Sequence, residues 1–302
     1  MSHYEILDPR FSALINGSAK LELLWTGGRW TEGPVYVPAA RHLVWSDIPN
    51  DRLMRYDEVS EVANLFQTPC GHHNGHTLDF EGRIIACEHS GRRVSRLDHD
   101  GEWRTLADRF EGKRLNSPND VVVKSDGSIW FSDPTYGIDS DYEGYAAASE
   151  VGASNVYRID PAAGALSLVA SDLVKPNGLA FSNDEQTLYV SDTGATHVPG
   201  LAGTIRAYPV TEDGRSLGEG SLFATCDCGL FDGFRVDRHG NIFTSSGDSV
   251  RVYAPDGVLI GRILVPEGVS NLTFGGPRRN RLYITATTSL YAIYVNSRPA
   301  AR

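Results

Sequence analysis

The sequence predicts an all-β fold, a six-bladed β-propeller that residues 1–302 form as a single domain. The 302 residues are 41% hydrophobic and 22% charged, a composition that supports a large buried core and excludes a disordered chain. With 31 glycines and 15 prolines, the chain is interrupted too often for long helices. One pattern also recurs six times along the chain, and this repetition decides the fold class.

Each repeat opens with a polar residue that is followed by a short apolar strand, a turn, a second apolar strand with a polar end, and a third strand. The six residues that open the repeats, here called the opening residues, are Glu32, Asn74, Asn119, Asn177, Asp232 and Asn271. They are 39 to 58 residues apart, which is the length of a four-stranded blade with insertions in the third and fourth repeats. Two β-sandwich domains, the competing architecture, would not require one signature to recur six times.

The elements within the repeats follow from alternating apolar runs and turn residues. Second strands are expected at 43–47, 84–89, 129–133 and 188–192, and third strands at 92–97, 155–160 and 250–254. The pairs that precede several second strands, such as Asp126-Gly127 and His239-Gly240, are typical of tight hairpins.

The last repeat is too short to form a complete blade. It has about 25 residues of strand pattern after Ser270, while residues 19–26 near the N-terminus carry alternating Leu21, Leu23 and Trp25. We therefore expect this N-terminal segment to supply the missing outer strand and close the ring, with residues 1–18 as an N-terminal extension.

Charge and cysteine content limit the partners and the compartment. The net charge of −10 disfavours nucleic acid and anionic membranes as partners. Neither a signal peptide nor 18 consecutive apolar residues is found, so a cytoplasmic location without a membrane span is expected. Free thiols are favoured for Cys70, Cys87, Cys226 and Cys228 over a Cys70–Cys87 disulfide, and assembly into homo-oligomers is left open.

The opening residues have the chemistry of a cation site. The first strand of every blade lines the channel of a propeller, so residues at one repeat position stand at one height around the axis. Two buried acids near an axis repel each other unless a cation compensates them. Hard oxygen donors suit Ca²⁺ best, with Mg²⁺, Mn²⁺ and Zn²⁺ as alternatives, and the expected ligands are Glu32, Asn119, Asn177 and Asp232. The competing interpretation is that each Asn-Gly or Asp-Gly pair only makes a turn.

A second layer of polar residues is expected around the mouth of this site. Asp47, His89, Asp133 and Asp192 each end a second strand, with capping or turn duty as the alternative. The loop at 138–153, in the insertion that contains Tyr136, is a candidate lid. The residues expected to contact substrate are Asn74, His76, Arg114, Asp133, Tyr136 and Asn271.

Four segments at opening residues resemble the senescence-marker-protein/gluconolactonase/luciferin-regenerating-enzyme family. They are Thr-Glu-Gly-Pro-Val at 31–35, Ser-Pro-Asn-Asp at 117–120, Pro-Asn-Gly-Leu-Ala at 176–180 and Phe-Asp-Gly-Phe at 231–234. The resemblance extends over about residues 21–295, and it places the family's metal-binding residues at the four expected ligands. The run 111–120, preceded by Cys87-Glu88-His89, is similar to the bacterial gluconolactonase branch.

This resemblance implies a divalent-metal-dependent hydrolase of lactones, most often sugar lactones. Animal relatives carry an Arg where this chain has Ser117, and Arg114 is the candidate to replace it.

The expected mechanism is metal-assisted hydrolysis, which needs no serine nucleophile. The metal would polarise the ring carbonyl and Asp232 would activate water, with His89 as the second candidate for the base. Two alternatives stay open: a phosphotriesterase or esterase on the same scaffold, and a non-enzymatic calcium-binding propeller.

Overall fold

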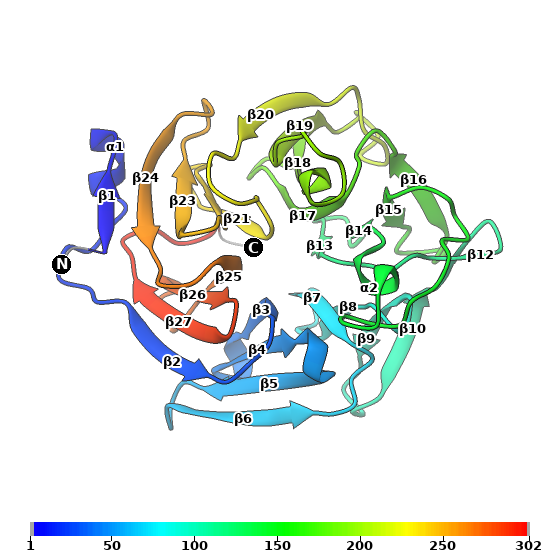
Figure 1. Ribbon diagram of the computed structural model, residues 1–302, viewed down its shortest axis with the longest axis horizontal. Coiled ribbons are helices and arrows are strands. Elements are labelled where there is room, and N and C mark those ends of the chain that lie inside the picture. Colours follow the sequence, from blue (N-terminus) through cyan, green and yellow to red (C-terminus); the bar gives the residue numbers. More distant parts are fainter. Residues whose placement is uncertain (1–2, 301–302) are drawn as a thin grey trace.

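The computed structural model describes residues 3–300 as six antiparallel sheets arranged around a central channel (Figure 1). The first three blades follow the chain from the innermost strand outward. Blade 1 contains β3 (Thr31–Val37), β4 (His42–Asp47), β5 (Arg52–Asp57) and β6 (Val62–Gln67); blade 2 contains β7 (His73–Leu78), β8 (Ile84–Glu88), β9 (Arg93–Leu97) and β10 (Trp103–Ala107); blade 3 contains β13 (Val121–Val123), β14 (Ile129–Asp133), β15 (Asn155–Ile159) and β16 (Leu166–Ala170).

The remaining blades complete the ring, and short elements decorate it. Blade 4 contains β17 (Pro176–Phe181), β18 (Thr187–Asp192), β19 (Thr204–Pro209) and β20 (Ser221–Thr225); blade 5 contains β21 (Phe234–Val236), β22 (Ile242–Thr244), β23 (Ser249–Tyr253) and β24 (Leu259–Leu264); blade 6 contains β25 (Val269–Gly275), β26 (Arg281–Ala286) and β27 (Ser289–Tyr294). The smaller elements are β11 (Arg109–Phe110), β12 (Lys113–Arg114), α1 (Pro9–Ser12), α2 (Tyr136–Asp139) and the 3₁₀ turns Pro38–Ala40, Ile48–Asn50 and Gly194–Thr196. The predicted six-bladed propeller is confirmed.

The core lies between the blades, which explains why the second strands are apolar on both faces. In β8, Ile85, Ala86 and Cys87 are all fully buried, because each side of the sheet packs against a neighbouring blade. Trp45 of β4 and Trp130 of β14 are also fully buried. This packing makes every blade depend on the next one around the ring.

The ring closes as the sequence predicts. Strand β2 (Glu22–Thr26) pairs antiparallel with β27, with Leu23 opposite Tyr291, and becomes the outer strand of blade 6. Figure 1 shows the two segments side by side, β2 in blue and β27 in red. The sheet therefore contains strands from both ends of the chain, and no blade edge is left open at the junction.

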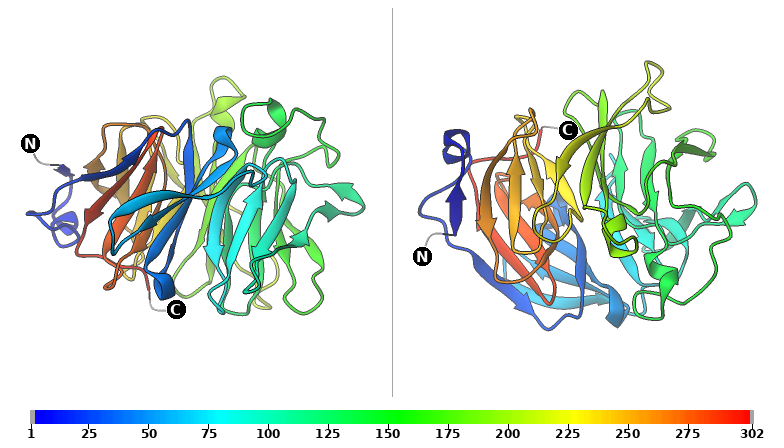
Figure 2. Two further views of the ribbon diagram at one scale, coloured as in Figure 1. Left: turned by 90° about the horizontal axis from the view of Figure 1, so that it is seen from below. Right: turned by 45° about the horizontal axis from the view of Figure 1, so that its top comes forward.

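The N-terminal extension contains structure that the sequence pattern did not indicate. Strand β1 (Tyr4–Ile6) pairs with β24 and gives blade 5 a fifth strand, and the first residue opposite it is Ile263. Phe11 of α1 is fully buried in the core cluster of blades 5 and 6. Figure 2 shows this segment lying against the outer edge of blade 5.

Two further expectations can be compared with the structure. No helix within residues 3–300 is both long and apolar enough to cross a membrane. The four cysteines are free, as predicted, and Cys70 and Cys87 are buried.

Candidate functional site

The structure brings the six opening residues together around the channel. Six hydrogen bonds link each blade to the next. Ser46 Oγ donates to the Asn74 carbonyl (2.9 Å), Gly75 N to the Asn119 carbonyl (2.8 Å), Ser132 Oγ to the Asn177 carbonyl (2.6 Å), Ser191 Oγ to the Asp232 carbonyl (2.9 Å), Gly233 N to the Ser270 carbonyl (2.8 Å), and Asn271 Nδ2 to Glu32 Oε2 (2.9 Å). Because the last contact joins blade 6 to blade 1, the opening residues form a closed ring.

The glycines that follow four of the opening residues permit this close approach. A Cβ on Gly33 would stand 1.8 Å from the Asn74 carbonyl oxygen, and a Cβ on Gly178 would stand 2.2 Å from the Asp232 carbonyl oxygen. At Gly233 the obstacle would be the Asn271 side chain, at 2.0 Å. The Asn-Gly pairs at 74–75 and 177–178 lie inside strands β7 and β17 rather than in hairpin turns.

Glu32 is an acid without an ion-pair partner among residues 3–300. It is 2% exposed, Oε2 accepts hydrogen bonds from Gly33 N and Asn271 Nδ2, and Oε1 has no hydrogen-bond partner in the described structure. Burial raises its pKa well above the ordinary value, and the nearby negative charges of Asp232 and Asp120 raise it further.

Asp232 is the second acid of the ring. Its pKa is raised to about 8, first by burial and then by the charges of Glu143 and Asp120, while a hydrogen bond from Asn177 opposes this shift. Two carboxylates whose ionised forms destabilise each other, one with an unpartnered buried oxygen, are the arrangement that a divalent cation would relieve.

The remaining expected ligands fit such an ion. Asn177 Nδ2 lies 3.5 Å from Thr193 Oγ1, which leaves its amide oxygen available, and Asn119 is fixed by backbone bonds to Ser132 and Gly75. Within residues 3–300, no three His, Cys, Asp or Glu side chains converge as a metal site. The donor set is therefore two carboxylates with carboxamides, which favours a hard cation that accepts neutral oxygens.

His89 orients an amide and is poorly suited to act as a base. Its Nδ1 lies 3.1 Å from the Glu143 carbonyl oxygen, so it donates there, and Nε2 accepts from Asn74 Nδ2 at 3.1 Å. Burial lowers its pKa to about 4. With both ring nitrogens occupied, the ring fixes Asn74, whose buried Oδ1 has no hydrogen-bond partner in the described structure.

His76 lies between blades instead of facing substrate. It is fully buried, Nδ1 donates to the Gly33 carbonyl at 2.7 Å, and Nε2 lies 3.3 Å from His73 Nδ1. The expectation that it contacts substrate is corrected, because its polar atoms bind blade 1 and β7 itself.

Three aspartates that end second strands fix loops by accepting hydrogen bonds from backbone N–H groups. Asp133 is fully buried, and its oxygens accept from Asn116 N and Ser117 N, both at 2.9 Å. Asp47 and Asp192 accept backbone N–H groups from the loops before β3 and β17 in the same way. The capping interpretation was the correct one for all three, and Asp133 is not exposed to a substrate.

The candidate lid consists of α2 and the loop at 138–153. Tyr136 Oη lies 2.7 Å from Thr193 Oγ1 and 2.9 Å from Thr196 Oγ1, and its ring packs under Lys175 Nζ. Gly137 lies so close to His89 that a Cβ would stand 2.4 Å from the His89 Cβ. The lid is therefore docked on blades 2 and 4, and Tyr136 is placed near Asp232.

Arg114 is not brought to the ring. It belongs to the small β11–β12 hairpin, where its N donates to Glu150 Oε2 (2.9 Å) and Nη2 to the Gly91 carbonyl (3.4 Å). None of its hydrogen bonds within residues 3–300 involves an opening residue. The structure thus gives no support to Arg114 as the replacement for an arginine at position 117.

Sequence reasoning missed two acids that influence the site. Glu143 of the lid has its pKa raised to about 7, mainly by burial, and its charge acts on Asp232. Asp120 is 1% exposed and acts on both ring acids. Asp120 could have been found as the acid beside an opening residue, whereas nothing in the loop composition singles out Glu143.

Fold and site together define a class of protein: a six-bladed propeller whose channel carries two carboxylates and four carboxamides in one ring. The family model described as the SMP-30/gluconolactonase/LRE-like region matches residues 30–288, and the chain belongs to this family.

Individual relatives agree with this assignment. The gluconolactonase of Zymomonas mobilis is 30% identical over 308 residues, which cover 94% of this chain and 84% of that protein. The solved structure of a gluconolactonase from Xanthomonas campestris matches with a TM-score of 0.90 at 38% identity, covering 97% and 94% of the two chains. Regucalcin from Agrobacterium tumefaciens, a calcium-binding protein, shares the fold with a TM-score of 0.74 at 21% identity, covering 93% and 96%.

Proposed function

We propose that this chain is a hydrolase of sugar lactones that uses a divalent cation, with Ca²⁺ as the first candidate. The observation that carries the proposal is the meeting of Glu32 and Asp232 in one buried ring, with raised pKa values and an unpartnered carboxylate oxygen. The similarity to gluconolactonases over most of the chain supports the substrate class.

Glu32, Asn119, Asn177 and Asp232 would hold the cation. When bound, it would supply Lewis acidity toward a carbonyl oxygen and neutralise the two acids. The observed hydrogen bonds already orient three of these side chains or their neighbours, since Asn271 binds Glu32 and Asn177 binds Asp232.

Residues of the chain itself would then accept and return the proton of the attacking water. A water molecule adds to the ring carbonyl carbon and transfers a proton to Asp232; the ring C–O bond breaks, and the proton passes to the departing ring oxygen, which gives a hydroxy acid. Asp232 is less buried than Glu32, so it is the acid of the pair that substrate can reach. His89 would keep Asn74 oriented, and the lid would limit the access of bulk water.

The test is lactone hydrolysis by metal-stripped protein to which Ca²⁺, Mg²⁺, Mn²⁺ or Zn²⁺ is returned singly. With glucono-δ-lactone, we expect metal-dependent acid release above the spontaneous rate, and a loss of at least about 100-fold in kcat/KM for Asp232→Asn and for Glu32→Gln. Glu111→Gln, at an exposed position, is the control and should keep full activity.

Other outcomes would redirect the proposal. Turnover of a phosphotriester or a p-nitrophenyl ester without lactone turnover would favour the esterase alternative. Stabilisation of the fold by Ca²⁺ with no turnover of any of these substrates would favour a calcium-binding propeller. Full metal-dependent activity in both acid variants would show that the proposed site is wrong.

A further inference from the structure

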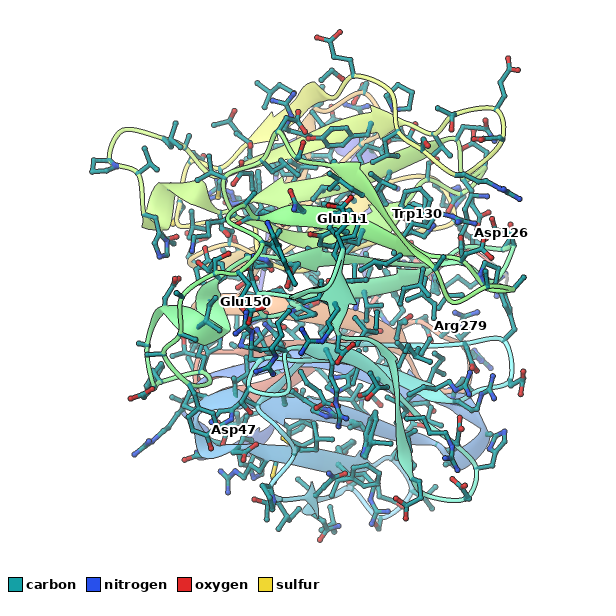
Figure 3. All side chains as sticks on the ribbon, turned by 90° about the vertical axis from the view of Figure 1, so that its right-hand side faces the viewer. Asp47, Glu111, Asp126, Trp130, Glu150 and Arg279 are labelled. Carbon is teal, nitrogen blue, oxygen red and sulfur yellow. The ribbon has the colours of Figure 1, made fainter. Side chains whose placement is uncertain are left out.

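The inner strands also line a cavity at the end of the channel opposite the lid. It has a volume of about 720 Å³, within the usual range of small-molecule sites. In Figure 3, Arg279, at its rim, lies on one side of the molecule, while Asp47 and Glu150 mark the other side, where the lid lies. This cavity is therefore separate from the ring of opening residues.

All six blades contribute to its wall, which combines apolar and polar side chains in similar measure. The wall is formed by residues that follow the opening residues along the inner strands, and many of these side chains are aliphatic or aromatic. Representative wall residues are Val35, Leu78, Val122, Phe181, Val236 and Phe274. Phe80, at the mouth, is 60% exposed. These side chains offer a surface against which an apolar part of a ligand can pack.

The acids at the mouth already have partners. Asp79 Oδ2 accepts from Arg83 Nε at 2.7 Å. Glu185 Oε1 accepts from Ser125 N at 2.9 Å, and Lys124 Nζ lies 3.3 Å from its Oε2. Asp184 accepts from Ser182 Oγ at 2.6 Å. Asp79 and Glu185 are therefore ion-paired at the edge of the cavity, and Asp184 is hydrogen-bonded there.

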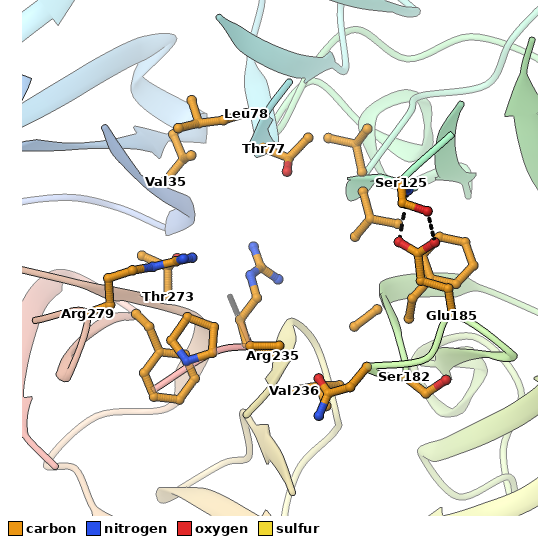
Figure 4. A pocket seen from close by; sticks show the side chains of 18 of the residues that line it. Val35, Thr77, Leu78, Ser125, Ser182, Glu185, Arg235, Val236, Thr273 and Arg279 are labelled. Carbon is orange, nitrogen blue, oxygen red and sulfur yellow. Dashed lines mark hydrogen bonds between the residues drawn. The ribbon is translucent and has the colours of Figure 1, made fainter. Parts of the chain in front are cut away.

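Two arginines reach into the cavity instead (Figure 4). Arg235 of β21 donates to the Phe234 carbonyl at 2.7 Å, and its Nη1 lies 3.7 Å from Asp120 Oδ2, beyond hydrogen-bond distance. The Arg279 guanidinium, at the rim, has no hydrogen-bonded or ion-paired partner among residues 3–300. Arg235, whose nearest acid is Asp120, and Arg279, at the rim, thus both offer guanidinium N–H donors to the cavity.

We propose that this cavity binds a small organic anion, a carboxylate on an apolar body, with the carboxylate between Arg235 and Arg279. A guanidinium offers paired N–H donors that match a carboxylate, and the apolar wall would cover the rest of the ligand. The proposal is independent of the proposed lactone chemistry, because none of its residues belongs to the ring.

The test is isothermal titration of the full chain with benzoate as the probe. We expect saturable binding, with benzamide and inorganic phosphate each at least about tenfold weaker, because benzamide lacks the charge and phosphate lacks the apolar body. Arg279→Gln should weaken benzoate about tenfold. Arg278→Gln is the matched control, since this exposed neighbour does not line the cavity.

Four results would overturn the proposal: no saturable benzoate binding, equal weakening by Arg278→Gln and Arg279→Gln, phosphate that binds as well as benzoate, or loss of benzoate binding in Asp232→Asn. The last result would place the probe in the ring of opening residues.

Phe80→Ser tests the apolar part of the wall separately, because it should weaken benzoate binding and leave phosphate binding unchanged. Arg235 is not substituted, because its removal would leave buried Asp120 without its nearest cation.

Discussion

At the scale of single residues, residue type and spacing fix which groups meet, and burial fixes what those groups can do. Asp133 and Asp232 are both aspartates near the channel. Asp133 accepts two backbone N–H groups, whereas Asp232 faces the charges of Glu143 and Asp120. The first therefore holds a loop, and the second is the acid that we propose for the chemistry.

The buried histidines make stability sensitive to acid. The pKa of His76 is lowered to about 3 and that of His89 to about 4, mainly by burial. Below about pH 6.5 these histidines take up protons in the unfolded chain but not in the folded one, so the contribution of each histidine to the free energy of unfolding falls by up to about 1.4 kcal/mol per pH unit. This stability is present above pH 6.5 and is lost as the pH falls toward the folded-state values.

The measurement is urea denaturation between about pH 7 and pH 5, and the variant is His76→Asn, which keeps a donor for the Gly33 carbonyl. The variant should be less stable than the wild type at pH 7. On acidification its free energy of unfolding should fall less than that of the wild type, by roughly the contribution of one titrating histidine. His239→Asn, at an exposed position, is the control. An unchanged pH slope in His76→Asn would mean that His76 titrates normally in the folded protein.

At the scale of elements, the lid depends on a glycine in α2. Gly137 N donates to Ser117 Oγ at 3.0 Å, and the backbone passes directly over His89. Because His89 in turn holds Asn74, the position of this short helix is transmitted to an opening residue.

Gly137→Ala should displace the lid. The added Cβ would stand 2.4 Å from the His89 Cβ and 2.8 Å from the Ser117 Cβ, and neither atom can rotate away. We expect kcat/KM for the lactone to fall at least about tenfold, since small displacements of positioning groups cost this much or more. Hydrogen exchange should show faster exchange in 138–153. Gly17→Ala, where nothing lies within 4 Å of the added Cβ, is the control, and wild-type activity in Gly137→Ala would contradict the docking role.

At the scale of elements, the sequence predicts the blades but not the role of every polar residue at their ends. The six blades and the closing strand could be predicted because the repeat remains recognisable despite its insertions. The ring of opening residues could be predicted because residues at the same repeat position lie at the same height along the propeller axis. Spacing cannot show whether a strand-end acid points to solvent or back to its own loop, so the roles of Asp47, Asp133 and Asp192 were not decided. Glu143 lies in an insertion without periodicity, where only the folded loop places its carboxylate.

At the scale of the whole molecule, both chain ends stabilise the ring. Strand β2 completes blade 6, and β1 with α1 covers the outer edge of blade 5, so residues before the first repeat contribute to two sheets. Strand β1 could not be identified beforehand, because three residues are too few to show an alternating pattern. A sheet edge that would otherwise be exposed is thereby paired.

Phe11→Ala tests this contribution. The ring is fully buried, occupies the space above Gly261, and contacts Tyr4 edge-on at 6.3 Å between ring centroids. Its removal leaves a cavity between blade 5 and α1, so the free energy of unfolding should fall by about 3–5 kcal/mol in urea denaturation. The kcat/KM for lactone at 25 °C should stay unchanged, because the ring of opening residues is held by other contacts. Leu7→Ala, at a position 46% exposed, should cost far less and is the control. Equal and small losses in both variants would show that the N-terminal segment only lies on the propeller and does not support it.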